Sequence, residues 1–204
     1  MKMMILALVI ALGFGCASSG DATRFYVLNP LDPGETLVKG TPPKAPLSVE
    51  IGSLYLPQYL ERPQIVTRQS ASRLDVAEFH QWGGNLRKDL MRVMAKNLSQ
   101  LLATPYISIS PHAPQVPPDF RLGMEVMRFE RDPDGKVRLS VQWSLTGGKD
   151  QALLTAQITE LESPAVAATT GMESTVTAMG LLWGELSRMI AEDVSKYASG
   201  RPGA

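Results

Sequence analysis

The chain has 204 residues, of which 44% are hydrophobic and 20% are charged, as expected for one globular domain with its own core. Its 20 basic and 20 acidic side chains give a formal net charge of +0, which leaves no basic surplus for holding nucleic acid. The single cysteine excludes an intrachain disulfide and a thiolate metal cluster.

The N-terminus has the pattern of a signal peptide over residues 1–15. Lys2 precedes the apolar run Met3–Phe14, which is well short of the roughly 20 residues that span a bilayer. Cys16 then follows the small residue Gly15, as in a bacterial lipobox. We therefore predict cleavage before Cys16, acylation of its thiol, and a lipidated tether over residues 16–24. The alternative, a plain thiol with cleavage elsewhere, stays open.

Strand signals begin directly after the tether. Residues 25–28 predict a first strand, and the proline-rich residues 29–46 predict a surface loop. Residues 47–53 alternate like a half-buried strand, and residues 65–68 are rich in β-branched side chains. We expect residues 69–81 to form a turn with a short extended piece around residues 74–76.

A proline-bounded corner joins the strands at residues 47–53 and 65–68. Pro57 and Pro63 each remove a backbone donor and disfavour helix at the preceding residue. Tyrosine and arginine are enriched in protein interfaces. Our candidate partner-binding residues in this region are Tyr59, Arg62, Gln64 and Trp82. The structural alternative is that Tyr59 packs on the following helix and Arg62 pairs with a carboxylate.

The second half of the chain predicts two helices separated by strands. An apolar stripe favours a helix from Trp82 or Asn85 to Leu102, and a second stripe favours a helix that begins past Gly171. Between them we expect a strand at residues 106–109 and a three-stranded meander with a β-bulge near Met127. Its first turn is the sequence DPDG at residues 132–135, and its last strand holds Ala152, Leu154, Ala156 and Ile158.

These elements predict an α+β single domain, a sandwich in which two amphipathic helices pack on one face of a mixed or antiparallel sheet. We predict no catalytic residue, metal or cofactor, because hydrolase, P-loop and zinc-protease motifs are absent. His80 and His112 have no patterned partner, and Asp132 with Asp134 lacks the further ligands that a calcium loop requires.

The corner and the helix after it resemble the PqiC family, the auxiliary lipoproteins of ABC-type mammalian-cell-entry (MCE) transport systems. The resemblance rests on LPQYLERPQIVTR, then EFHQWGGNLRKDLMRVMAKNL, and on FYVL near the mature start. The matching residues are Val49, Leu56, Pro57, Tyr59, Leu60, Arg62, Pro63, Ile65, Val66, Trp82, Leu86, Asn97 and Leu98.

The resemblance implies a PqiC-like domain over residues 25–198. The glycine- and proline-containing end of the chain predicts a disordered tail over residues 199–204. It implies a non-enzymatic lipoprotein on the periplasmic face of the outer membrane of a Gram-negative bacterium. Its partner would be an MCE-domain protein that spans the periplasm, and its cargo phospholipid or another hydrophobic molecule. Self-association stays open. Two other classes also stay open: a lipoprotein that regulates or assembles a cell-wall or outer-membrane machine, and a periplasmic hydrolase.

Overall fold

The computed structural model describes residues 22–37, 47–112, 114, 116–147, 150–167 and 171–199. Its strands and helices in chain order are β1 (Arg24–Tyr26), β2 (Val49–Tyr55), the 3₁₀ turn η1 (Gln58–Leu60), β3 (Gln64–Ser70), β4 (Arg73–Trp82), α2 (Leu86–Leu101), β5 (Ile107–Ile109), β6 (Phe120–Arg131), β7 (Val137–Gly147), β8 (Ala152–Glu162) and α3 (Gly171–Ser199). The predicted α+β domain is confirmed, with two helices on a mixed sheet of eight strands.

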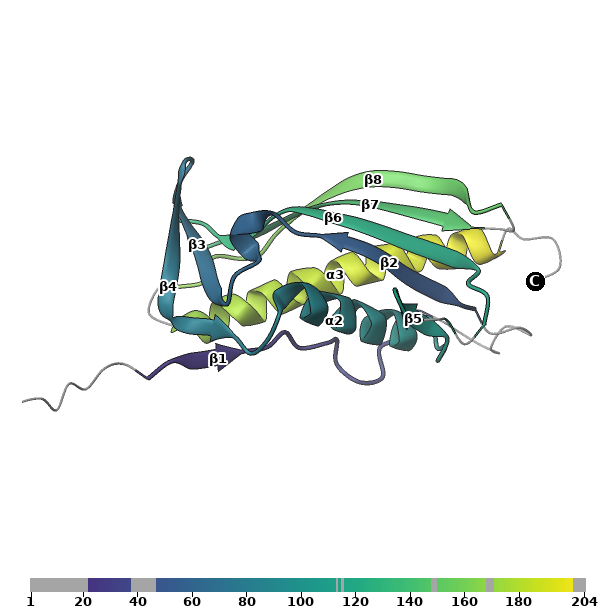
Figure 1. Cartoon of the computed structure of the whole chain (residues 1–204), viewed down its shortest axis with the longest axis horizontal. Helices are drawn as coiled ribbons and strands as arrows, with labels where there is room; N and C mark the ends of the chain where they lie inside the picture. The colour runs from purple at the N-terminus through teal and green to yellow at the C-terminus, as the bar shows by residue number, and fades with distance from the viewer. Residues whose placement is uncertain are drawn as a thin grey trace, which may run out of the picture.

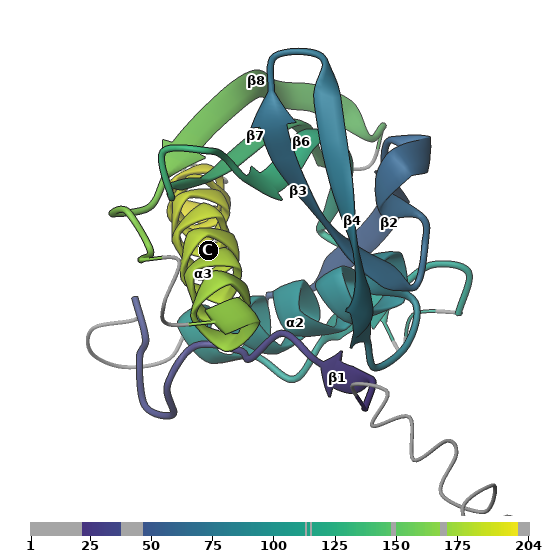
Figure 2. The same ribbon diagram turned by 90° about the vertical axis from the view of Figure 1, so that its left-hand side faces the viewer.

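Strand β6 is the centre of the sheet. One of its edges pairs antiparallel with β7, and β7 pairs antiparallel with β8. The other edge pairs with parallel β2 and then, at Arg131, with Thr67 of β3. Apart from β7 and β8, the order of hydrogen-bonded strands across the sheet is β1-β4-β3-β6-β2-β5. Both helices lie on one side of the sheet, which curves over them when viewed end-on (Figures 1 and 2).

The predicted bulge near Met127 is confirmed. The register of β6 against β7 shifts between Val126 and Arg128. Val126 and Phe129 are therefore both buried, although their spacing does not fit a strict alternation, and Met127 between them is 40% exposed. The predicted turn after β6 is also confirmed: Gly135, at φ +83°, donates its backbone N–H to the Asp132 carbonyl at 3.0 Å.

The helices begin and pack as their sequences indicate. The Asn85 side chain accepts the N–H of Lys88 at 3.0 Å and caps α2, so Gly83 and Gly84 lie outside the helix. The apolar stripes of α2 and α3 are buried. The Trp183 indole of α3 donates to the Leu90 carbonyl of α2 at 3.0 Å, which joins the two helices inside the core.

Two strands differ from the prediction. Residues 73–82 form the ten-residue strand β4, which pairs with β3 as a hairpin, instead of a turn with a short extended piece. Half of the β4 residues are exposed, and they fall on both faces of the strand, so its sequence lacks the alternation that marks a half-buried strand. In β8 the apolar residues do not mark the buried face: Ile158 is 59% exposed, whereas Thr159 is buried and accepts the Trp143 indole N–H.

Candidate interaction surfaces

The proline corner is a compact turn built on η1. Pro57, at φ −58° and ψ 143°, precedes the 3₁₀ turn, and its carbonyl accepts the N–H of Leu60 at 2.9 Å. Leu60 is buried and fixes the turn to the core. The corner closes where the Trp82 N–H donates to the Pro63 carbonyl at 2.7 Å, which ties β4 to the corner. The chain between β2 and β3 therefore has a defined shape.

Beneath the corner, the buried carboxylate of Glu130 collects four donors. Tyr59 Oη donates to Oε2 at 2.7 Å, and the Phe129 N–H donates to the same oxygen at 3.1 Å. Arg68 Nε and Arg128 Nε donate to Oε1 at 2.7 and 2.9 Å. Burial, followed by the bond to Glu130, raises the pKa of the Tyr59 phenol above its usual value. The charge of Glu130 is thus compensated, and the corner is fixed to β6.

The candidate residues of the corner have different environments. Trp82 is only 6% exposed and packs in the core, and Tyr59 is half-buried over Glu130. Gln64 is half-buried beside Gln81, whereas Arg62 is exposed. Within the described residues, the Arg62 side chain makes no ion pair, so the pairing expected by the structural alternative is not found. The Tyr59 hydroxyl bonds to Glu130 of β6, and its side chain packs against the core.

Two features near the corner were missed by the sequence analysis. Tyr55, at the end of β2, is 64% exposed just before the corner. The β3–β4 hairpin stands out from the body (Figure 1), and its Val76 and Phe79 are 42% and 39% exposed. The sequence signal for these exposed side chains was an apolar residue in a segment that lacks alternation of apolar and polar residues.

The N-terminal segment, residues 22–37, is held against both helices. The Leu28 N–H donates to Asp89 Oδ2, and the Leu31 N–H donates to Asn97 Oδ1, both at 2.9 Å. The buried Asn97 also donates from Nδ2 to the Ser187 hydroxyl at 3.0 Å. The Asn97 amide therefore joins the N-terminal segment, α2 and α3. This gives a physical reason for the Asn-Leu pair at residues 97–98.

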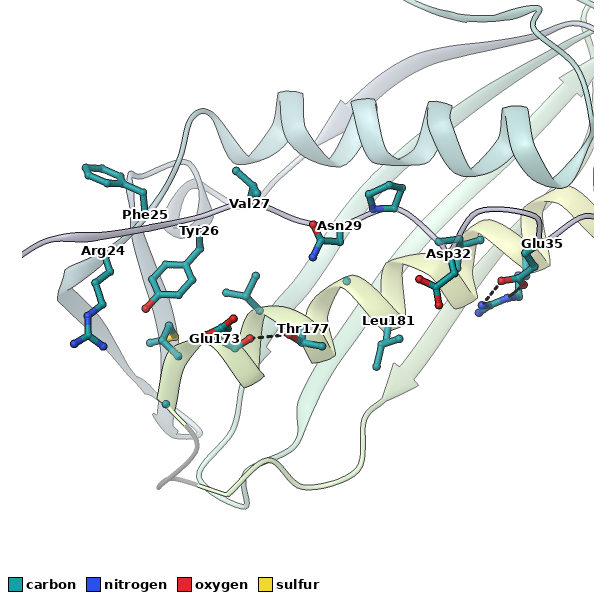
Figure 3. A pocket seen from close by; sticks show the side chains of 17 residues that line it. Arg24, Phe25, Tyr26, Val27, Asn29, Asp32, Glu35, Glu173, Thr177 and Leu181 are labelled. Atoms are coloured by element: carbon teal, nitrogen blue, oxygen red, sulfur yellow. Dashed lines mark hydrogen bonds and ion pairs between the residues drawn. The ribbon is translucent and has the colours of Figure 1, made fainter.

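A groove of about 710 Å³ runs between the N-terminal segment and the first half of α3 (Figure 3). Arg24 and Tyr26 point toward α3, whereas Phe25 and Val27 point to the opposite side of the segment. Phe25, Val27 and Leu181 line the groove and are 67%, 55% and 64% exposed. At the far end of the groove, Glu35 pairs with Arg188, and hydrogen bonding to this arginine lowers the pKa of Glu35.

The remaining candidates do not assemble into a reactive site. His80 Nδ1 lies 2.7 Å from Tyr26 Oη, a contact that joins β1 to β4. The exposed His112 lies 3.3 Å from the Ile109 carbonyl. Among the described residues, no group of three or more His, Cys, Asp or Glu side chains could hold a metal ion. None of the described helices is long and apolar enough to cross a membrane. Cys16 lies outside the described residues.

Comparison with known proteins gives a family match over most of the chain. The model of the ABC-type transport auxiliary lipoprotein component matches residues 26–191. A crystal structure of an uncharacterized protein shares 20% identity, with a TM-score of 0.68 over 85% of this chain and 99% of that one. A DUF330 protein from Xanthomonas campestris shares 13% identity, with a TM-score of 0.69 over 87% of this chain and 100% of that one. These two structures share the fold. No curated protein gave a significant match.

Proposed function

We propose that this chain, which belongs to the family of ABC-type transport auxiliary lipoprotein components, is the outer-membrane-anchored subunit of an MCE-type system that moves phospholipid or another hydrophobic cargo. The observation that carries the proposal is the family match over residues 26–191. This range includes α2, α3 as far as Ala191, and every strand except the first two residues of β1. The predicted signal peptide and lipidation of Cys16 support an anchor on the N-terminal side of this body. Several acyl chains would hold it stably at a membrane. Ala17, instead of the aspartate that retains lipoproteins at the inner membrane, favours the outer membrane.

The protein would support transport as a binding subunit without turnover of its own. Its two histidines lie apart, one beside Tyr26 and one near the Ile109 carbonyl. The partner would be an MCE-domain protein that spans the periplasm. The surface offered to it would be the corner together with the end of β2, where Arg62 and Tyr55 are exposed and Glu130 fixes the turn from beneath. An exposed arginine and tyrosine on a rigid turn have the chemistry of interface anchors.

Co-purification tests the proposed function. The intact lipoprotein, solubilised in detergent, should retain an MCE-domain protein from the same cells. The variant Arg62→Glu should weaken retention, whereas Lys96→Glu, a charge reversal at an exposed position of α2, should not. A panel of hydrolase substrates run on the same preparation should show no turnover. Robust hydrolysis without MCE retention would contradict the proposal, and retention of a cell-wall synthase instead would favour the regulatory class.

A further inference from the structure

Strand β1 is an open edge of the sheet. It stands at one end of the strand order and, among the described residues, pairs only with β4. The Gly83 N–H donates to the Tyr26 carbonyl at 2.7 Å, so the backbone groups of Tyr26 face β4. Because successive residues of a strand direct these groups to alternate sides, the N–H and carbonyl of Phe25 face away from β4. An open edge of this kind can accept one more strand from another chain.

The side chains of β1 and the residue after it divide into two faces of different chemistry. Figure 3 shows Arg24 and Tyr26 pointing toward α3, whereas Phe25 and Val27 point the opposite way. Phe25 and Val27 are 67% and 55% exposed, so their face is apolar and open to solvent. On the other face lies the groove of about 710 Å³ between the N-terminal segment and α3. A strand added to β1 would place its own side chains alternately on these two faces.

The groove has a surplus of negative charge. At its far end Glu35 pairs with Arg188, so these two charges compensate each other. Asp32 of the N-terminal segment and Glu173 in the first turn of α3 line the groove and make no ion pair with any described residue. Of the described lining residues, Arg24 is the single cation left to balance them. A basic side chain that enters the groove from an added strand would supply the missing positive charge.

We infer that the free edge of β1 binds an extended segment of a partner protein by strand addition. The segment alternates apolar side chains, which lie on the face of Phe25 and Val27, with basic side chains, which enter the groove. Main-chain hydrogen bonds to Phe25 supply affinity, and the alternation supplies specificity. The inference rests on the proposed function in one respect, namely that the MCE-domain partner provides this segment. It gives that partner a second contact besides the corner.

Binding of synthetic peptides tests the added strand. The probe is a fluorescent peptide of about seven residues, about 23 Å when extended, in which valine and lysine alternate. It is titrated into the intact lipoprotein in detergent and followed by fluorescence anisotropy. It should bind, and its affinity should fall as salt rises, because the groove contact is ionic.

Two control peptides test the pattern. An alternating valine–glutamate peptide should bind more than about tenfold more weakly, since like charges then meet in the groove. A peptide with the valines and lysines of the probe in two blocks should also bind more weakly, because it cannot match both faces of β1. Equal binding of the three peptides would overturn the inference.

Two variants of one residue separate the backbone from the side chain. Phe25→Ala removes the ring and keeps the outward N–H, whereas Phe25→Pro removes the N–H as well. Because this N–H does not face β4, proline is compatible with the edge strand. Phe25→Pro should bind the alternating probe about two- to tenfold more weakly than Phe25→Ala, as expected for one lost hydrogen bond. Equal affinities of the two variants would overturn strand addition.

The charges of the groove are tested without a change in β1. The double variant Asp32→Asn with Glu173→Gln should weaken binding of the alternating probe and reduce its dependence on salt. Glu160→Gln, at an exposed position of β8, should change neither. Unchanged binding in the double variant would overturn the basic character assigned to the segment.

Co-purification separates this inference from the proposed function. Phe25→Pro should retain less of the MCE-domain protein than Phe25→Ala does. Retention that is equal in the two variants would overturn the assignment of the strand to this partner and leave the proposed function intact. Probe binding that depends on position 25, in a native protein that retains no MCE-domain protein, would support strand addition and contradict the proposed function. A probe that dissociates a dimer of the lipoprotein would assign the edge to a second copy and overturn the partner.

Discussion

Tyr59 donates its hydroxyl proton to the carboxylate of Glu130 at 2.7 Å, across 71 residues of sequence. Glu130 is fully buried on β6, so this bond fixes the proline corner to the centre of the sheet. The corner that carries Arg62 is therefore both part of the folded core and an exposed surface. Its buried and exposed residues can be tested separately.

Removal of the Tyr59 hydroxyl should destabilise the fold. The variant Tyr59→Phe removes one of the four donors to the Glu130 carboxylate, and a hydrogen bond to a charged group contributes about 1.5–3 kcal/mol. Chemical denaturation should show this loss in the free energy of unfolding. The control Tyr55→Phe, at a side chain that is 64% exposed, should stay within about 0.5 kcal/mol of the native protein. Equal stability of the two variants would contradict the role of the Glu130 cluster.

Alkaline pH should weaken the same contact. The folded pKa of Tyr59 lies above the unfolded value of 10.0, chiefly because of burial and then because of Glu130. Its contribution is fully present below the unfolded pKa and is lost as pH rises through 10 toward the higher folded pKa. Unfolding free energies measured between pH 9 and the alkaline limit should therefore fall more steeply for the native protein than for Tyr59→Phe. Parallel curves would contradict the assignment.

The acidic side of the pH profile should show the Glu35–Arg188 pair. Arg188 lowers the pKa of Glu35 below 4.5 through a hydrogen bond, so the stabilisation is present above that pH and is lost as pH falls through the folded pKa. The side chains are each about one-third exposed, which limits the effect. Glu35→Gln should remove a small part of the acid-induced loss in melting temperature, and Glu160→Gln, an exposed control on β8, should not.

The Asn97 amide should hold the N-terminal segment on the helices. Asn97→Ala removes the acceptor for the Leu31 N–H and the donor to Ser187, both at buried sites, with an expected loss of about 1–3 kcal/mol. Hydrogen exchange should accelerate most over residues 28–37. Lys96→Ala, at the neighbouring exposed position, serves as control. Uniform acceleration throughout the protein, with no excess in this segment, would rule out a local clamp.

We predict that anchorage depends on Cys16. Cys16→Ser removes the thiol that would carry the diacylglycerol, so the protein should leave the membrane fraction. Fractionation of the cell envelope measures this, with unsubstituted protein as the reference. A variant that still partitions wholly with the outer membrane would contradict lipid anchorage through Cys16.

The features that could be predicted from the sequence were local ones. The start of α2 near Asn85, the turn at residues 132–135 and the register shift at Met127 each depend on a few neighbouring residues. Strand β4 was missed because, away from the core, no apolar alternation is required of it. Of the candidate partner-binding residues, Arg62 is exposed in the corner, whereas Trp82 lies in the core and is only 6% exposed.

The contacts between distant segments could not be predicted. Glu130 is a charged residue on an apolar strand, and nothing near it in sequence indicates that Tyr59 and Arg68 will meet it. The groove combines residues 24–35 with residues 171–188. Its one sequence signal is Leu181, an apolar residue outside the buried stripe of α3.

Crosslinking in intact cells tests the central claim most directly. A photoreactive amino acid is placed at position 62, on the exposed corner, and at position 96, on the outer face of α2, and the captured proteins are identified by mass spectrometry. We predict that position 62 captures an MCE-domain protein and that position 96 does not. Capture at position 62 of a cell-wall or outer-membrane assembly protein, with the MCE-domain protein absent from both positions, would contradict the account.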